Sequence, residues 1–121
     1  MQISAILLAL LPAASMVSAD CYGSGINWGV HRDAALRAVD AWCAPHTLAG
    51  YFNQGQTKGK CVNTGAQHVN FEVGWRGGGG LALANQDCQK RLKDEILGCD
   101  RGGQKTTADW WFRADPNEGG C

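Results

Sequence analysis

The segment Gln67-His68-Val69-Asn70-Phe71-Glu72-Val73-Gly74-Trp75-Arg76 alternates, from His68 onward, between positions held by polar residues or glycine and apolar positions. Successive side chains of a β-strand point to opposite faces, so one face of this strand is apolar and the other is polar. This pattern is typical of an antiparallel sheet with one buried face and one face in contact with water. The apolar face carries Val69, Phe71, Val73 and Trp75, and the opposite face carries His68, Asn70, Glu72, Gly74 and Arg76.

Further strands are predicted on both sides of this segment. The four glycines at 77–80 indicate a flexible turn, so we expect residues 81–83 to form a hairpin with the strand at 67–76. Residues 48–52 and 60–63 resemble a second antiparallel pair. The sheet is therefore expected to be mainly antiparallel.

Two helices accompany these strands. From Val30 to about Ala44 the apolar side chains recur at helical spacing, and Pro45 ends the pattern. The second helix is expected to begin with Asn85 as its N-cap and to end with Gly98 in a left-handed conformation. The order of helix, strands, helix and strand predicts an α+β fold, in which an antiparallel sheet is flanked by two main helices as a sandwich.

Residues 1–19 have the features of a secretory signal peptide. The run from Ile3 to Leu11 is apolar but too short to span a bilayer, and Pro12 follows it. The small residues of Val17-Ser18-Ala19 then offer a cleavage pattern just before Asp20. We therefore expect a secreted, extracellular protein with a single disulfide-stabilised domain at residues 20–121.

The expected mature chain contains an even number of cysteines. It has no C-x-x-C or C-x-H spacing of the kind that zinc sites use, so no metal site is predicted. In a small secreted domain such cysteines indicate three disulfides, which would supply much of the stability that a small core lacks. The six residues are Cys21, Cys43, Cys61, Cys88, Cys99 and Cys121.

The expected second helix restricts how these cysteines can pair. Cys88 and Cys99 would lie about 16 Å apart along its axis, which is too far for a disulfide. If the last strand returns antiparallel to that helix, Cys121 comes near Cys88. The expected pairs are then Cys88–Cys121, Cys43–Cys61 and Cys21–Cys99.

The charge balance argues against several classes of partner. Eleven Lys and Arg side chains are matched by eleven Asp and Glu side chains, so the chain has no net field to hold nucleic acid or an anionic membrane. The sequence also has no cationic amphipathic face of the kind that lies on membranes. We expect no nucleic-acid partner and no stable membrane insertion.

Catalytic constellations are weak in this sequence. His68, Glu72 and Arg76 share a strand face and suggest a ribonuclease, but His68 and Glu72 would lie about 13 Å apart, too far to serve one phosphodiester. Ser24 has no triad partners, and the glycines at 77–80 lack the helix and lysine of a phosphate-binding loop. We therefore predict a protein that is not an enzyme, with no catalytic residues and no cofactor.

The tryptophans indicate a binding surface instead. Residues 110–114 are expected to form the last strand, closed by a turn at 115–117. Trp110 would be buried, while Trp111 would lie beside Arg113 on the wetter face. An aromatic ring with polar groups around it suits a sugar, although packing of Trp111 under a helix or at a dimer seam is the somewhat favoured alternative. The candidate ligand-binding residues are Trp111, Arg113, Asn70, Glu72 and Arg76.

Several short motifs carry a family resemblance. They are Cys21-Tyr22-Gly23-Ser24-Gly25, the segment from Gly55 to Cys61, Asn85-x-x-Cys88 running to Cys99, and Trp111-Phe112-Arg113-Ala114-Asp115-Pro116-Asn117 followed by Cys121. Together these resemble fungal small secreted proteins of the mushroom glycan-binding type, the Y-three-like domain family. The resemblance implies a helix-flanked antiparallel sheet, which a homodimer can continue, that binds a glycan or glycoprotein containing fucose or N-acetylhexosamine. It assigns no binding residue of this chain.

Two other interpretations remain open at this point. A secreted effector or killer-toxin-like protein, acting on a protein or membrane target, would share the signal peptide, the size and the six cysteines. A small secreted ribonuclease is the less favoured alternative, for the geometric reason given above.

Overall fold

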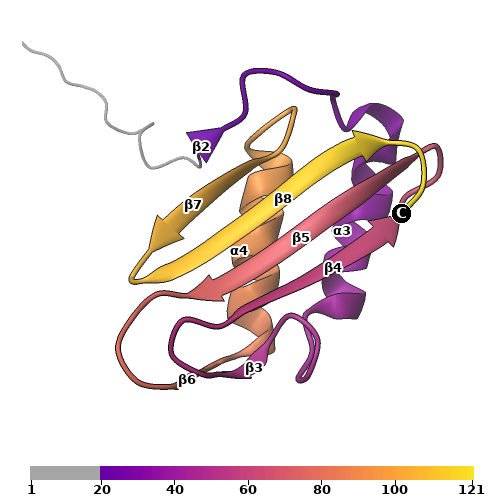
Figure 1. Ribbon diagram of the computed structural model, residues 1–121. Coiled ribbons are helices and arrows are strands. Elements are labelled where there is room, and N and C mark those ends of the chain that lie inside the picture. Colours follow the sequence, from indigo (N-terminus) through magenta and orange to yellow (C-terminus); the bar gives the residue numbers. More distant parts are fainter. Residues whose placement is uncertain (1–19) are drawn as a thin grey trace, which may run out of the picture.

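The computed structural model describes residues 20–121, so the expected signal peptide lies outside the described residues. Within them, one short strand precedes the first helix, four strands separate the two helices, and two strands follow the second helix (Figure 1). They are β2 (Asp20–Cys21), a 3-10 turn η1 (Gly29–His31), α3 (Arg32–Trp42), β3 (Gly50–Phe52), β4 (Thr57–Asn63), β5 (Gln67–Trp75), β6 (Leu81–Leu83), α4 (Asn85–Leu97), β7 (Gly103–Thr107) and β8 (Trp110–Glu118).

The fold has a sheet layer and a helical layer. Five strands form an antiparallel sheet in the order β2-β7-β8-β5-β4. Helices α3 and α4 lie next to each other against it, as Figure 1 shows. The predicted α+β sandwich of an antiparallel sheet with two main helices and three disulfides is confirmed.

The alternation in β5 separates the two faces of the sheet as predicted. Val69, Phe71 and Val73 are fully buried, and Phe112 and Ala114 of the neighbouring β8 join them in the core. The helices contribute the opposite wall of this core, with α3 and α4 burying Ala35, Val39, Leu92 and Ile96. The core therefore fills the space between the sheet and the helices and leaves the other face of the sheet polar.

The two predicted strand pairings near the glycine loop are wrong. β6 pairs with β3, not with β5, and β4 pairs with β5. Both edges of β5 are thus occupied, by β4 and β8. The glycine loop turns away because Trp75 Nε1 donates to the carbonyl oxygen of Gly79, whose own N–H donates to Gln54 Oε1.

The C-terminal strand is longer than predicted, because residues 115–117 continue β8 instead of forming a turn. Pro116 lies opposite Val69 of β5. On the other side of β8, the pairing with β7 stops at Gly103 opposite Ala114, so Pro116 is not required to donate a hydrogen bond to β7. Strand β7 itself was not predicted, since its residues lack an apolar–polar alternation.

Details of the helix ends also differ from the sequence prediction. Val30 lies in the 3-10 turn before α3, and its side chain is exposed. The N-cap of α4 is Ala84, not Asn85, and no side chain caps this end. Gly98 follows α4 with a φ of −91°, so the expected left-handed conformation is wrong.

Two of the three predicted disulfides are wrong. Cys21–Cys99 is confirmed, but the other bridges are Cys43–Cys88 and Cys61–Cys121. Cys43 follows the end of α3, and Cys88 lies in the first turn of α4, so one bridge joins the two helices. The sheet register explains the other bridge, because Asn63 of β4 and Glu118 of β8 lie at the same end of β5, opposite His68 on one edge and Gln67 on the other. Three intramolecular disulfides are typical of extracellular proteins.

Glycines 102 and 119 provide a test of this packing. Both have a left-handed φ, at +76° and +81°, but only a Cβ on Gly102 would overlap the carbonyl oxygen of Ala114. We expect Gly119→Ala to cost about 1–2 kcal/mol for its conformation alone. Gly102→Ala should cost about 1–3 kcal/mol more because of the overlap. Urea unfolding of both variants measures this difference, and equal losses would contradict the close approach.

Glu95 gives the core a titratable group. Its side chain is 2% exposed, and its Oε1 has no hydrogen-bond partner. Burial raises the pKa of Glu95 from 4.5 to about 7, with Lys105 opposing the rise and Asp94 and Asp20 adding to it.

The folded state therefore favours protonated Glu95, so the contribution of Glu95 to stability should be most favourable below pH 4.5 and should be lost as the pH rises through about 7. Glu95→Gln should remove this loss and stabilise the protein at pH 8, by on the order of 3 kcal/mol, with little effect at pH 4. The exposed Glu118→Gln is the control. Urea unfolding at both pH values measures the effect, and an unchanged pH dependence in Glu95→Gln would contradict it.

Candidate functional site

The face of the sheet that points away from α3 and α4 is polar, and no helix of residues 20–121 covers it (Figure 1). Its side chains come mainly from alternate positions of β5 and β8. The strand register places Glu72 of β5 directly opposite Arg113 of β8. In the next row of this face, Asn70 lies opposite Asp115. We call this surface the outer face.

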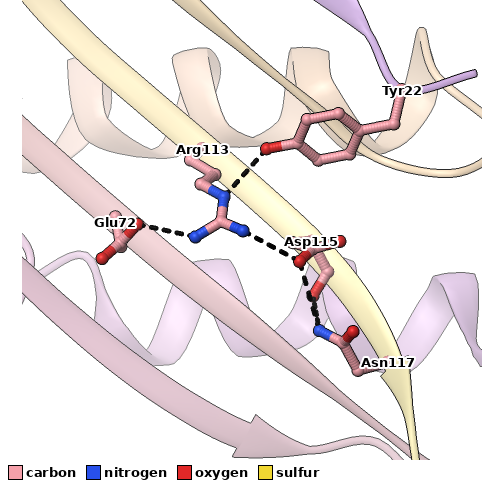
Figure 2. A network of polar contacts seen from close by, with 5 residues as sticks. All are labelled: Tyr22, Glu72, Arg113, Asp115 and Asn117. Carbon is pink, nitrogen blue, oxygen red and sulfur yellow. Dashed lines mark hydrogen bonds and ion pairs between the residues drawn. The ribbon is translucent and has the colours of Figure 1, made fainter. Parts of the chain in front are cut away.

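Arg113 is the centre of a network on the outer face (Figure 2). Its Nη1 donates to Glu72 Oε1 at 2.8 Å, and its Nη2 donates to Asp115 Oδ2 at 3.0 Å. Its Nε donates to the hydroxyl oxygen of Tyr22 at 2.8 Å. The hydrogen bond with Glu72 is the main reason that the pKa of Arg113 lies above its ordinary value, although partial burial opposes the rise. All three guanidinium nitrogens are thus held by different segments of the chain.

Two partners of Arg113 in the network, Asp115 and Tyr22, are themselves held by further contacts. Asn117 Nδ2 donates to Asp115 Oδ2 at 3.3 Å, as Figure 2 shows. Tyr22 follows Cys21, which is bonded to Cys99, and the N–H of Tyr22 donates to the carbonyl oxygen of Gly102. These contacts limit the movement of the carboxylate and the hydroxyl that hold Arg113, so the arrangement exists before any ligand binds.

Trp111 lies next to this network and forms a pair with Arg76. The Trp111 side chain is partly exposed, and its cross-strand neighbour is Gly74. Because Gly74 has no side chain, the Arg76 guanidinium can lie over it, where a Cβ would be only 2.5 Å from Arg76 Nη1. The Cζ of Arg76 is 5.1 Å from the Trp111 ring centroid, and Nη1 donates to Thr57 Oγ1 at 3.1 Å. Such a contact is a cation–π interaction.

A shallow hollow of about 220 Å³ opens on the outer face beside the network. Asn70, Glu72 and Arg113 line it, and Gly59 of β4 lies opposite Glu72. Because Gly59 has no side chain, the surface of the outer face is depressed at this position relative to the residues around it. The hollow offers carboxylate, carboxamide and guanidinium groups together, which are able both to accept and to donate hydrogen bonds.

All five residues selected from the sequence therefore lie on the outer face. Asn70, Glu72 and Arg113 line the hollow, while Trp111 and Arg76 form the adjacent pair. Sequence reasoning missed Tyr22 and Asp115. Asp115 was assigned to a turn, and a strand that continued the alternation of Trp111 and Arg113 would have placed it on this face. The sequence around Tyr22 contains no comparable signal.

The outer face separates the groups that RNA cleavage would require. His68 and Glu72 are four positions apart on β5, or about 13 Å, and they have different partners. His68 Nδ1 is 3.0 Å from the carbonyl oxygen of Gly119, whereas Glu72 binds Arg113. The arrangement therefore does not bring these two groups to one phosphodiester.

Residues 20–121 contain no group of three or more His, Cys, Asp or Glu side chains that could hold a metal ion. The helices of this same part of the chain are not long and apolar enough to cross a membrane.

Comparison with known proteins adds no assignment: no protein-family model matches this chain, and no curated protein matches its sequence. The function is therefore inferred from the geometry of the outer face and from the sequence motifs.

Proposed function

We propose that this is a secreted, non-catalytic glycan-binding protein that holds its ligand on the outer face, at Trp111, Arg113, Asn70, Glu72 and Arg76. The observation that carries the proposal is the position of a partly exposed indole beside a hollow lined by fixed polar groups. Sugars have the complementary chemistry, with C–H faces that cover an aromatic ring and hydroxyls that meet polar atoms.

Preorganisation supports binding at this site. Arg113 already has three acceptors, so a ligand does not need to order its side chain. Glu72 and Asp115 each use one carboxylate oxygen in these bonds, and a carboxylate has further lone pairs that accept hydrogen bonds from hydroxyls. Holding such groups in place before binding reduces the entropy that a complex loses.

The charges of the outer face also suit a sugar. Arg76 and Arg113 supply two positive charges, and Glu72 and Asp115 supply two negative charges, so these four side chains sum to zero. A surface that is locally balanced has no strong preference for a charged ligand. It recognises hydroxyl and amide groups through hydrogen bonds instead.

The sequence motifs give the proposal its biological setting. The chain resembles fungal small secreted proteins of the mushroom glycan-binding type, and residues 1–19 have the pattern of a secretory signal peptide. The three disulfides agree with export to an oxidising compartment. A glycan or glycoprotein outside the cell is therefore the proposed partner.

A glycan array with the oxidised protein tests the proposal. We expect binding to a defined set of glycans and a loss of at least about tenfold in affinity for Trp111→Ala. Trp111→Phe keeps an aromatic ring and should retain part of the affinity. Arg101→Ala, an exposed arginine that binds the Gly25 carbonyl oxygen outside this face, is the control.

Two results would argue against the proposal in different ways. An array without any bound glycan would remove the function. Full binding by a folded Trp111→Ala variant would leave the function in place but move the site elsewhere. Folding of each variant is checked by circular dichroism and by its thermal unfolding midpoint.

A further inference from the structure

A second hollow, of about 550 Å³, lies beside β4, the last strand in the order of the sheet. It is formed by the loop before β3, by β3 itself and by the first half of β4. Figure 1 shows these segments together at one end of the molecule. Its lining includes His46, Tyr51, Asn53, Gln56 and Lys58, and none of its lining residues is acidic. We call this second hollow the edge pocket.

Lys58 is a positive charge without a matching negative charge. Its Nζ donates to the carbonyl oxygen of Ala49 at 2.6 Å and lies 4.1 Å from the centre of the Phe52 ring. Among the described residues no carboxylate forms an ion pair with it. Burial lowers the pKa of Lys58 because the ammonium group loses water there. An anion next to Nζ would compensate this loss.

The sequence around the edge pocket also contains more basic than acidic residues. Between Asp40 and Glu72 the chain contains no Asp or Glu, yet it contains Lys58, Lys60 and two histidines. This positive segment stands out in a chain with no net charge. The edge pocket therefore differs from the outer face, where Arg113 forms ion pairs with Glu72 and Asp115.

Two residues of the edge pocket, Tyr51 and His46, have distinctive local geometry. The Tyr51 side chain is 61% exposed although it belongs to a strand, and its hydroxyl group occupies the space where a Cβ on residue 80 would lie. Gly80 therefore makes room for it. His46 has a φ of 71°, which is uncommon for a residue with a side chain. Backbone strain of this kind concentrates at functional sites.

We propose that the edge pocket is a second binding site, which takes a small ligand carrying one oxyanion. The oxyanion, a carboxylate or a sulfate, binds the ammonium group of Lys58. The carbon skeleton of the ligand lies against the Tyr51 ring, and the carboxamides of Asn53 and Gln56 bind its hydroxyls. This site is independent of the glycan site on the outer face.

Binding of simple probes to the full domain tests this site. Isothermal titration or NMR would compare D-glucuronate with D-glucose, which lacks the oxyanion, and N-acetylglucosamine 6-sulfate with N-acetylglucosamine. We expect the acidic sugar of at least one pair to bind and its neutral counterpart to bind at least about tenfold more weakly. The pair in which the acidic sugar binds more tightly shows whether the pocket prefers a carboxylate or a sulfate. Inorganic sulfate shows whether the anion suffices without a sugar.

Lys60 supplies a matched control for Lys58. Lys60 lies two residues after Lys58 in β4, and its Nζ is also 4.1 Å from the centre of an aromatic ring, that of Trp42. Unlike Lys58, it does not line the edge pocket. Lys58→Met should weaken binding of the acidic sugar at least about tenfold, and Lys60→Met less than about threefold. Because Lys58→Met also loses the bond to Ala49, Tyr51→Ala and Lys58→Arg provide second variants, which should weaken and preserve binding respectively.

Three results would overturn the proposal. They are equal binding of acidic and neutral sugars, unchanged binding by both Lys58→Met and Tyr51→Ala, and no binding of any probe at millimolar concentration. Trp111→Ala should leave this binding intact, so a loss in that variant would place the acidic sugar on the outer face and would also overturn it. The outcome at the edge pocket is therefore read separately from the glycan array.

Discussion

The pairing of β5 with β8 is the constraint on which the rest of the structure depends. The two strands are in register over nine residue pairs, from Gln67 opposite Glu118 to Trp75 opposite Trp110. This register places Val73 and Phe112 in the core and places Glu72 and Arg113 outside it. A slip of one residue in either strand would exchange its two faces and bury charged side chains. Fold and candidate site therefore follow from the same register.

The Arg113 network contributes more to the shape of the outer face than to stability. Its ion pairs are partly exposed, with Arg113 at 31% and Glu72 at 35%, and exposed ion pairs typically contribute only about 0–1 kcal/mol. The network nevertheless joins β5, β8 and the segment after β2, which the Cys21–Cys99 bridge anchors. A rigid polar surface of this kind suits recognition, because the cost of ordering it is met during folding.

The sequence predicted the elements whose signal is local. The alternation at 67–76 identified β5 and its two faces, and it was sufficient to bring Asn70, Glu72 and Arg76 to one surface. The same alternation at 110–114 placed Trp111 and Arg113 on that surface. Helical spacing identified both helices. In each case the pattern is repeated over many residues, and a single exception does not hide it.

The errors arose where distant contacts decide the outcome. The partner of residues 81–83 depends on hydrogen bonds among Trp75, Gly79 and Gln54, which no local pattern reveals. The Cys121 bridge depends on the strand register, and reasoning from the second helix gave the wrong partner. Asp115 was assigned to a turn because Asp-Pro-Asn is common in turns. The edge pocket lies within the single stretch 46–59, but its lining residues follow neither strand nor helix spacing, so no periodic pattern indicated it.

We propose the outer face of β5 and β8 as the surface that recognises the ligand. An NMR titration of the ¹⁵N-labelled domain with the strongest glycan from an array tests it directly, because Trp110 and Trp111 are adjacent but point to opposite faces. If the ligand binds there, the Trp111 Nε1–H and Arg113 Nε–H resonances shift while the Trp110 Nε1–H resonance changes little. Shifts confined to the helices, or to the pocket around Tyr51 and Lys58, would contradict it.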